Sequence, residues 1–160
     1  MIIENKRVKR VLTLIFILYV ILLLGVVTLR FLYPDKLFQM HNAITSGEVS
    51  PNFEIFKTIK NQLSNLGSGY ANWNILANTV CFMPFGFLLP LITKKPCGLL
   101  LTAFLGLLFS GLIESAQLIF KIGVFDIDDL ILNTAGVVLG YVIARVGYAI
   151  FGTHSVKKRK

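Results

Sequence analysis

One long apolar segment restricts what this chain can become more than any other feature. Residues 11–29 contain no charged side chain. A helix of that length covers about 28 Å at about 1.5 Å per residue, close to the hydrocarbon thickness of a bilayer. A signal peptide has a shorter apolar region of about 7–15 residues that ends at a small-residue cleavage site, and neither feature is present. We interpret the segment as a full transmembrane helix.

Three further apolar segments follow, and the composition agrees with a membrane protein. They cover residues 72–93, 97–120 and 130–150, while the first span extends to about residue 32. Charged residues make up 15% of the chain, against about 25% in a soluble domain. This balance excludes a soluble globular domain and a disordered chain. The sequence predicts an all-α, polytopic membrane protein: a four-transmembrane-helix bundle in a single domain of residues 1–160.

The formal net charge of +8 comes largely from clusters that indicate membrane topology. These clusters lie within residues 6–10, 94–95 and 157–160, at the ends of the apolar spans. With the N-terminus inside, all three fall on the cytoplasmic side, as the positive-inside rule requires. We expect a multi-pass protein of the cell membrane with both termini in the cytoplasm. A nucleic-acid surface would need basic residues spread over one folded face, so no nucleic-acid partner is expected.

The loop of residues 33–71 is the one sizeable polar segment and is expected outside the cell. Its prolines and glycines argue against one continuous element. Residues 52–63 place Phe53, Phe56 and Ile59 at mostly helical spacing, after Asn52, which is suited to cap a helix. The pattern predicts a short outer amphipathic helix. It lies either on the outer leaflet or on the outer end of the bundle.

Polar and ionisable residues inside the apolar spans are the first candidates for function, because lipid makes each of them costly. At helical spacing, each of the last three spans carries one polar stripe. The stripes contain Asn74 and Asn78, then Glu114 and Gln117, then Asp129 and Asn133, preceded by Asp126. Counted from the outer helix ends, Asn78, Glu114 and Asn133 lie within about 6–9 Å of the same interface. We expect an outward-open polar pocket with residues 126–129 at its rim.

Each polar residue also has a structural interpretation. Asn78, Gln117 and Asn133 are suited to hydrogen bonding between helices, at about 0.6 kcal/mol each. Glu114 fits such a role least, because a carboxylate about 9 Å deep costs several kcal/mol unless it is paired, hydrated or protonated. The Gly-x-x-x-Gly motif at residues 136–140 indicates close helix packing.

Two blocks of the chain have a distinctive spacing: Asn74-x3-Asn78-x3-Phe82-x-Pro84-x-Gly86, and Glu114-x2-Gln117-x8-Asp126-x2-Asp129-x3-Asn133-x2-Gly136-x3-Gly140. This spacing resembles that of the VanZ-like family of bacterial membrane proteins. The resemblance implies a small polytopic protein whose relatives lower susceptibility to teicoplanin and related glycopeptide or lipoglycopeptide antibiotics. It also implies a set of recurrent polar positions, the expected ligand-binding residues Asn74, Asn78, Glu114, Gln117, Asp126, Asp129 and Asn133.

One departure from the family pattern bears on the ligand. Many relatives have an arginine shortly before the first aspartate of the acidic segment, where this chain has Gly123 and Val124. Lys121 is the nearest cation. The departure weakens any mechanism in which a bidentate arginine holds an anionic ligand.

Three functions stay open on the sequence. The first is a binding protein for a cell-envelope amphiphile, such as a lipid-linked cell-wall precursor or a lipoglycopeptide, with membrane lipids as further partners. The second is a membrane-embedded enzyme that modifies a lipid or cell-wall precursor, with Glu114 as general acid or base and Asp126 or Asp129 as its partner carboxylate. The third is ion-coupled transport.

The sequence gives no sign of a cofactor site. His41 and His154 are expected on opposite sides of the membrane, and no EF-hand loop is present, so neither a metal nor another cofactor is expected. The oligomeric state stays open.

Overall fold

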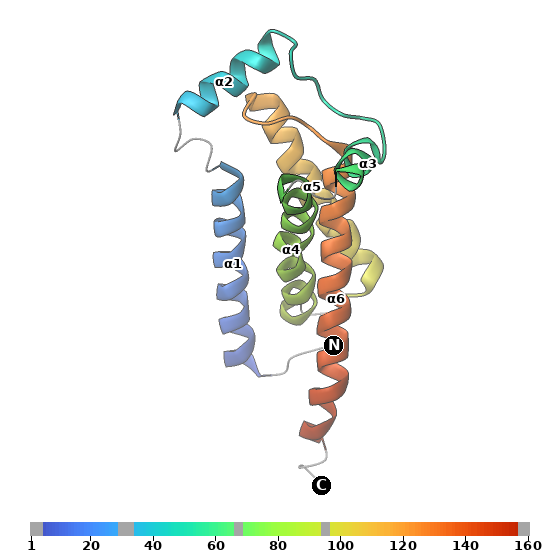
Figure 1. Ribbon diagram of the computed structural model, residues 1–160. Coiled ribbons are helices and arrows are strands. Elements are labelled where there is room, and N and C mark those ends of the chain that lie inside the picture. Colours follow the sequence, from blue (N-terminus) through green and yellow to red (C-terminus); the bar gives the residue numbers. More distant parts are fainter. Residues whose placement is uncertain (1–4, 29–33, 66–68, 94–96, 157–160) are drawn as a thin grey trace.

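Six helices make up the part of the chain that the computed structural model describes, residues 5–28, 34–65, 69–93 and 97–156 (Figure 1). Their bounds are α1 Lys6–Thr28, α2 Pro34–Thr45, α3 Lys57–Ser64, α4 Gly69–Ile92, α5 Leu99–Phe120 and α6 Ile127–Val156. Four of them, α1, α4, α5 and α6, are long and apolar enough to cross a membrane. They alternate in direction, so α1 begins and α6 ends at the same end of the bundle (Figure 1). The all-α, four-span prediction is confirmed.

The first and last spans differ from the predicted 11–32 and 130–150 at their ends. α1 begins earlier because Asn5 Oδ1 accepts hydrogen bonds from the backbone N–H of Arg7 at 2.9 Å and of Val8 at 3.3 Å, which caps a basic first turn. Lysine and arginine are good helix formers, so this turn continues into the apolar segment. α6 extends beyond the apolar segment at both ends. The clusters at residues 94–95 and 157–160 lie outside the described residues.

Small residues bring α6 directly onto α4 along the length of the bundle. A Cβ on Gly136 would collide with the backbone carbonyl of Thr79, and one on Gly140 with that of Met83. The close helix packing expected from the Gly-x-x-x-Gly spacing is therefore present. α6 also packs on α5, whereas α1 packs on α4.

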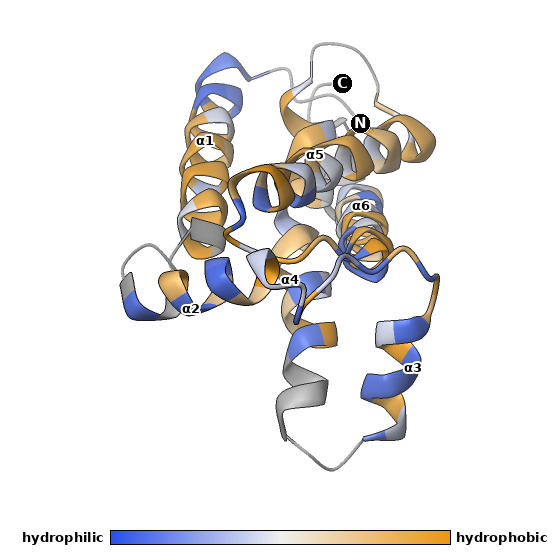
Figure 2. Cartoon of the chain, turned by 90° about the horizontal axis from the view of Figure 1, so that it is seen from above, coloured by the Kyte–Doolittle hydropathy of each residue, from blue (hydrophilic) through white to orange (hydrophobic). Residues whose placement is uncertain are grey.

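Two shorter helices, α2 and α3, lie at the end of the bundle that carries residues 126–129, which we name the acidic end (Figures 1 and 2). α2 was not predicted. Its sequence signals are the proline at its first position, Asp35 in the first turn, and Leu37, Met40 and Ile44 at helical spacing.

α3 is shorter than the predicted helix over residues 52–63. It begins at Lys57, after Phe56 in the left-handed conformation with φ of 64°, and Asn52 does not cap it. Asn52 instead pairs with the start of α6: its N–H donates to Phe125 O at 2.8 Å, and its carbonyl accepts from Ile127 N–H at 3.0 Å. Because α3 packs against α4 and α6, the location on the bundle end is favoured over a helix lying on lipid.

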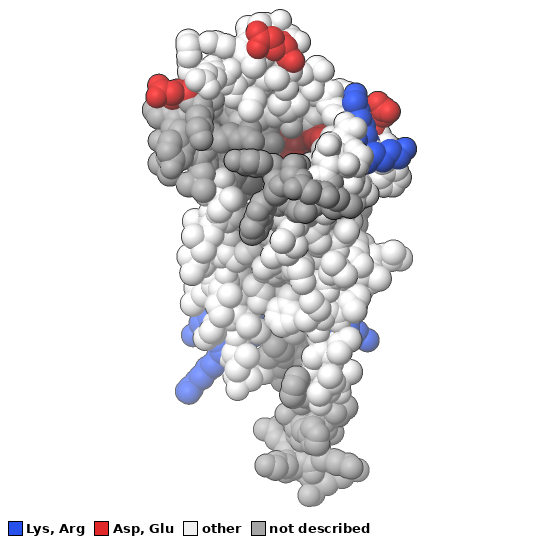
Figure 3. All heavy atoms as spheres, viewed as in Figure 1, with Lys and Arg blue, Asp and Glu red and all other residues white. Residues whose placement is uncertain are grey.

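The charged side chains lie at the two ends of the bundle. In Figure 3, acidic atoms are seen at the acidic end, basic atoms are seen at both ends, and an uncharged belt lies between them. Such a belt is typical of the surface that faces hydrocarbon.

Candidate functional site

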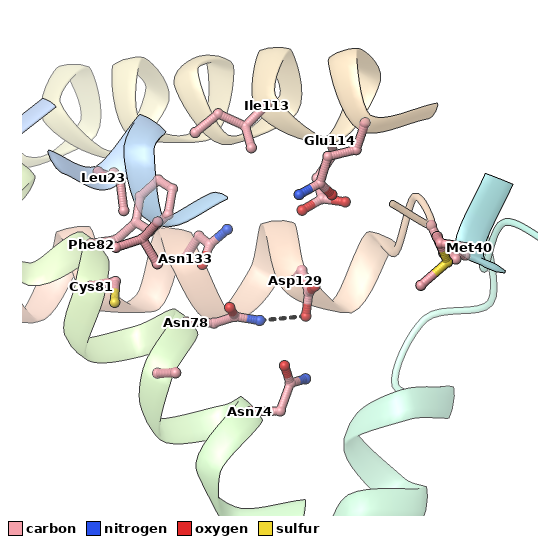
Figure 4. Close-up of a pocket in the computed structure, with 14 residues that line it drawn as sticks. Leu23, Met40, Asn74, Asn78, Cys81, Phe82, Ile113, Glu114, Asp129 and Asn133 are labelled. Atoms are coloured by element: carbon pink, nitrogen blue, oxygen red, sulfur yellow. Dashed lines mark hydrogen bonds between the residues drawn. The ribbon is translucent and has the colours of Figure 1, made fainter. Parts of the chain in front are cut away.

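A cavity of about 260 Å³ opens between the helices near the acidic end. The polar residues that line it are Asn74 and Asn78 from α4, Glu114 and Gln117 from α5, and Asp129 and Asn133 from α6. Six of the seven expected ligand-binding residues therefore surround one space. In Figure 4, Asn74, Asn78 and Glu114 point toward Asp129. The convergence arises because each helix carries one polar stripe and the three stripes lie at the same depth.

The carboxylate of Asp129 is hydrogen-bonded by a side chain of α4. Asn78 Nδ2 donates to Asp129 Oδ1, and Asn74, one turn earlier on the same helix face, points toward the same carboxylate (Figure 4). Two amides on one helix therefore face a half-buried carboxylate on another (Figure 4), and no lysine or arginine is among the described residues that line the cavity.

Asn133 connects α6 to α5 deeper in the bundle. Its side chain is only 4% exposed and its Nδ2 donates to the fully buried Ser110 Oγ at 2.9 Å. Its Oδ1 is buried and has no hydrogen-bond partner in the described part of the chain. Buried acceptors without partners are uncommon, because each costs about 1–3 kcal/mol.

Glu114 and Gln117 lie where α5 meets the turn before α6. Glu114 is 4% exposed, and its Oε2 accepts a hydrogen bond from the backbone N–H of Asp126 at 3.3 Å. Gln117 lies against Gly123, where a Cβ would come within 3.0 Å of the Gln117 Cδ. A glycine at this position therefore leaves room for the glutamine side chain.

Asp126 is the predicted site residue that does not line the cavity. Its Oδ1 accepts from Asn52 Nδ2 at 2.9 Å and from the backbone N–H of Asp128 at 2.9 Å, and its Oδ2 accepts from Thr58 Oγ1 at 2.6 Å. The Asp126 carboxylate therefore links both Asn52 and the first turn of α3 to the start of α6.

The carboxylate of Asp128 also binds the start of α3. It is fully buried, and its two oxygens accept from the backbone N–H of Phe56 at 2.6 Å and of Ile59 at 3.1 Å. The expectation that residues 126–129 together form the rim of the pocket therefore does not hold: among these aspartates, Asp129 alone lines the cavity. Lys121, the cation nearest to the acidic segment in the sequence, donates to Thr45 Oγ1 at 3.5 Å and does not line the cavity.

The apolar part of the cavity comes partly from helices that the spacing argument did not include. Leu23 and Val26 of α1 line one side, and Met40 of α2 lies over the acidic end. Leu23 and Val26 are ordinary apolar residues of an apolar span, and Met40 lies in a polar segment for which no helix was predicted, so no local sequence signal distinguishes them.

A cluster of apolar side chains closes the cavity toward the middle of the membrane. It consists of Leu23, Phe82, Phe85, Ile113 and Val137, all of them buried. The cavity therefore has a polar acidic end and an apolar floor.

Four long apolar helices with a cavity between them near one end define a multi-pass membrane protein. A family model described as VanZ/LLP1 matches residues 16–151. The chain belongs to the VanZ/LLP1 family, which is associated with glycopeptide resistance. Searches of the curated proteins and of the solved structures found no match.

Proposed function

We propose that this protein lowers susceptibility to glycopeptide or lipoglycopeptide antibiotics by binding a cell-envelope amphiphile in the cavity. The observation that carries the proposal is the lining itself: six polar side chains at the acidic end meet an apolar side and floor. Sites for small molecules are mostly apolar, with a few convergent polar groups that orient the ligand. An amphiphile presents the same two kinds of surface.

The size of the cavity limits what enters it. Its volume of about 260 Å³ lies just below the range of about 300–1,000 Å³ that is usual for drug-sized ligands. A headgroup, one sugar or one amino acid fits, whereas a whole glycopeptide does not. The remainder of the ligand therefore stays outside the cavity.

The packing of α1 suggests where that remainder lies. Among the described residues, no Cα of α1 comes within 8 Å of a Cα of α5 or α6, although Leu23 and Val26 of α1 line the cavity beside Ile113 of α5. The side between α1 and α5 is thus closed by apolar side chains, without close backbone packing. An acyl chain is suited to lie along this side while the headgroup occupies the polar end.

Filling the cavity tests the proposal. Ala77 and Ala135 are both exposed, but Ala77 lines the cavity and Ala135, on α6, lies outside the lining. We expect Ala77→Trp to remove protection against teicoplanin in cells and to abolish lipid binding in native mass spectrometry, while Ala135→Trp retains both. Full protection in the Ala77→Trp variant, at an equal protein level in the membrane, would refute the proposal.

The proposed orientation places the acidic end outside the cell. The basic turn at residues 6–10 lies at the opposite end, and the positive-inside rule assigns such a turn to the cytoplasm. In a chain whose own cysteines are replaced by serine, Glu48→Cys should react with an impermeant maleimide in intact cells, whereas Lys6→Cys should react only after lysis. The reverse pattern would place the cavity toward the cytoplasm.

An enzyme is the second candidate, because Glu114 and Asp129 come from facing helices and share the cavity (Figure 4). Paired carboxylates in different environments are suited to general acid–base catalysis. A catalyst should lose turnover but keep ligand affinity in Glu114→Gln, whereas a pure binding protein has no turnover to lose. Mass spectrometry of lipids and cell-wall precursors, with and without the chain, distinguishes the two: an altered species indicates chemistry.

Transport ranks third. The cluster of Phe82, Phe85 and Val137 lies beneath the cavity, and in the described bundle it supplies no polar continuation toward the opposite end. Ion pathways through membranes are lined by polar or charged groups.

A further inference from the structure

The hydrogen-bond inventory of the cavity shows which kind of ligand group it suits. The Nδ2 of Asn133 is used by Ser110, and the side-chain nitrogen of Asn78 is used by Asp129. The Oδ1 of Asn133 is buried, belongs to a residue that lines the cavity, and has no partner in the described part of the chain. A ligand that donates a hydrogen bond to this oxygen would remove the cost of leaving a buried acceptor unpaired.

The charge of the lining favours a cation. Glu114 and Asp129 contribute carboxyl groups, and no lysine or arginine is among the described residues that line the cavity. The helix N-terminus of α6 is not open to an anion, because the backbone N–H of Asp128 already donates to the Asp126 carboxylate. A phosphate in the place of an amine would therefore meet like charge without a compensating donor of its own.

The spacing of Asp129 and Asn133 along α6 lets one functional group reach both side chains. Asp129 and Asn133 are four residues apart on α6 and both line the cavity, so their Cβ atoms are separated by about 5–6 Å. Two N–H donors on one tetrahedral nitrogen reach acceptors that are roughly 5 Å apart, given hydrogen bonds of about 2.9 Å each.

We propose that the headgroup bound in this cavity carries a protonated primary amine, which donates to Asn133 Oδ1 and to the carboxylate of Asp129. The ligand class is an amphiphile with an ethanolamine-type or aminoacyl headgroup. This inference rests on the proposed binding of an amphiphile and names its polar group. A quaternary ammonium carries the same charge but has no N–H to donate, and a glycerol headgroup has neither the positive charge nor the N–H.

A series of headgroups tests the inference on the unaltered full-length protein. The probes are phosphatidylethanolamine, its N-monomethyl and N,N-dimethyl derivatives, phosphatidylcholine and phosphatidylglycerol, all with the same acyl chains, titrated in native mass spectrometry. We expect affinity to fall as N–H groups are removed, with at least about a tenfold loss between ethanolamine and choline, since hydrogen bonds to charged groups are of that strength. Phosphatidylglycerol should bind no better than phosphatidylcholine.

Two variants complete the test. Asp129→Asn removes the charge with little change of shape and should reduce the preference for ethanolamine over choline, whereas Asp35→Asn removes an exposed carboxylate outside the lining and should not. Because the headgroup series needs no variant, the inference stays testable even if Asp129→Asn does not fold.

The outcomes separate this inference from the proposed function. Equal affinity for all the lipids would overturn the amine and leave amphiphile binding in place. Binding of none of them would overturn the amine-bearing lipid headgroup, and full protection in Ala77→Trp as well would overturn amphiphile binding. Displacement of the lipid by free ethanolamine at a similar concentration would support amine recognition and overturn the role of the acyl chain.

Discussion

Replacing Asp128 by alanine tests whether one buried carboxylate of α6 holds α3 in place. Its oxygens accept from the backbone N–H of Phe56 at 2.6 Å and of Ile59 at 3.1 Å. Phe56 has φ of 64°, a region that costs a residue with a side chain about 1–2 kcal/mol, so the first bond holds an unfavourable conformation. We expect the variant to release α3 while the four long helices stay folded, because both bonds go to the start of α3.

The size of the effect follows from the two bonds. A hydrogen bond to a charged group contributes about 1.5–3 kcal/mol, and loss of a helix N-cap costs about 0.5–2 kcal/mol. We take about 2–4 kcal/mol for the pair, because the two bonds to the start of α3 are lost together. This corresponds to roughly 30- to 1,000-fold in the equilibrium between docked and released α3.

Hydrogen–deuterium exchange on the purified full-length chain measures that equilibrium, because local opening controls exchange of these amides. Exchange in peptides that cover residues 56–60 should accelerate by the factor above, while peptides from α5 stay unchanged. Asp129→Ala is the matched control, since this neighbouring carboxylate makes no described bond to α3. Unchanged exchange in α3, or equal acceleration throughout the bundle, would refute the reasoning.

Two further predictions concern the contact between α4 and α6. Gly140→Leu should lower the free energy of unfolding by at least about 1–3 kcal/mol, because the new side chain would meet the backbone of Met83. Gly147→Leu is the control and should be tolerated, since no atom lies within 4 Å of a Cβ at that position. Equal losses of thermal stability in the two variants would contradict the packing described. A double-mutant cycle of Asn78→Ala and Asp129→Ala should give a coupling of about 0.6–1.7 kcal/mol, and additive effects in unfolding measurements would mean that the bond between them is not formed.

Only part of the candidate site was predictable from spacing. Asn74, Asn78, Glu114, Gln117, Asp129 and Asn133 could be selected because helical periodicity and depth in a membrane are local properties that the sequence records directly. Asp126 was expected at the rim of the pocket and among the recurrent polar positions of the family, yet its carboxylate is used by Asn52 and Thr58. Those partners lie 74 and 68 residues earlier in the chain, and no local pattern states which acceptor a distant donor reaches.

The sequence by itself determined the four spans and the layer of polar residues near one end. Hydrocarbon permits little besides a helix where a backbone must satisfy its own hydrogen bonds, so the apolar segments decide the architecture almost alone. The tertiary structure decided which carboxylates face the cavity and which hold α3, and it brought Leu23 and Met40 into the lining. Those outcomes depend on pairing and packing between helices that are far apart along the chain.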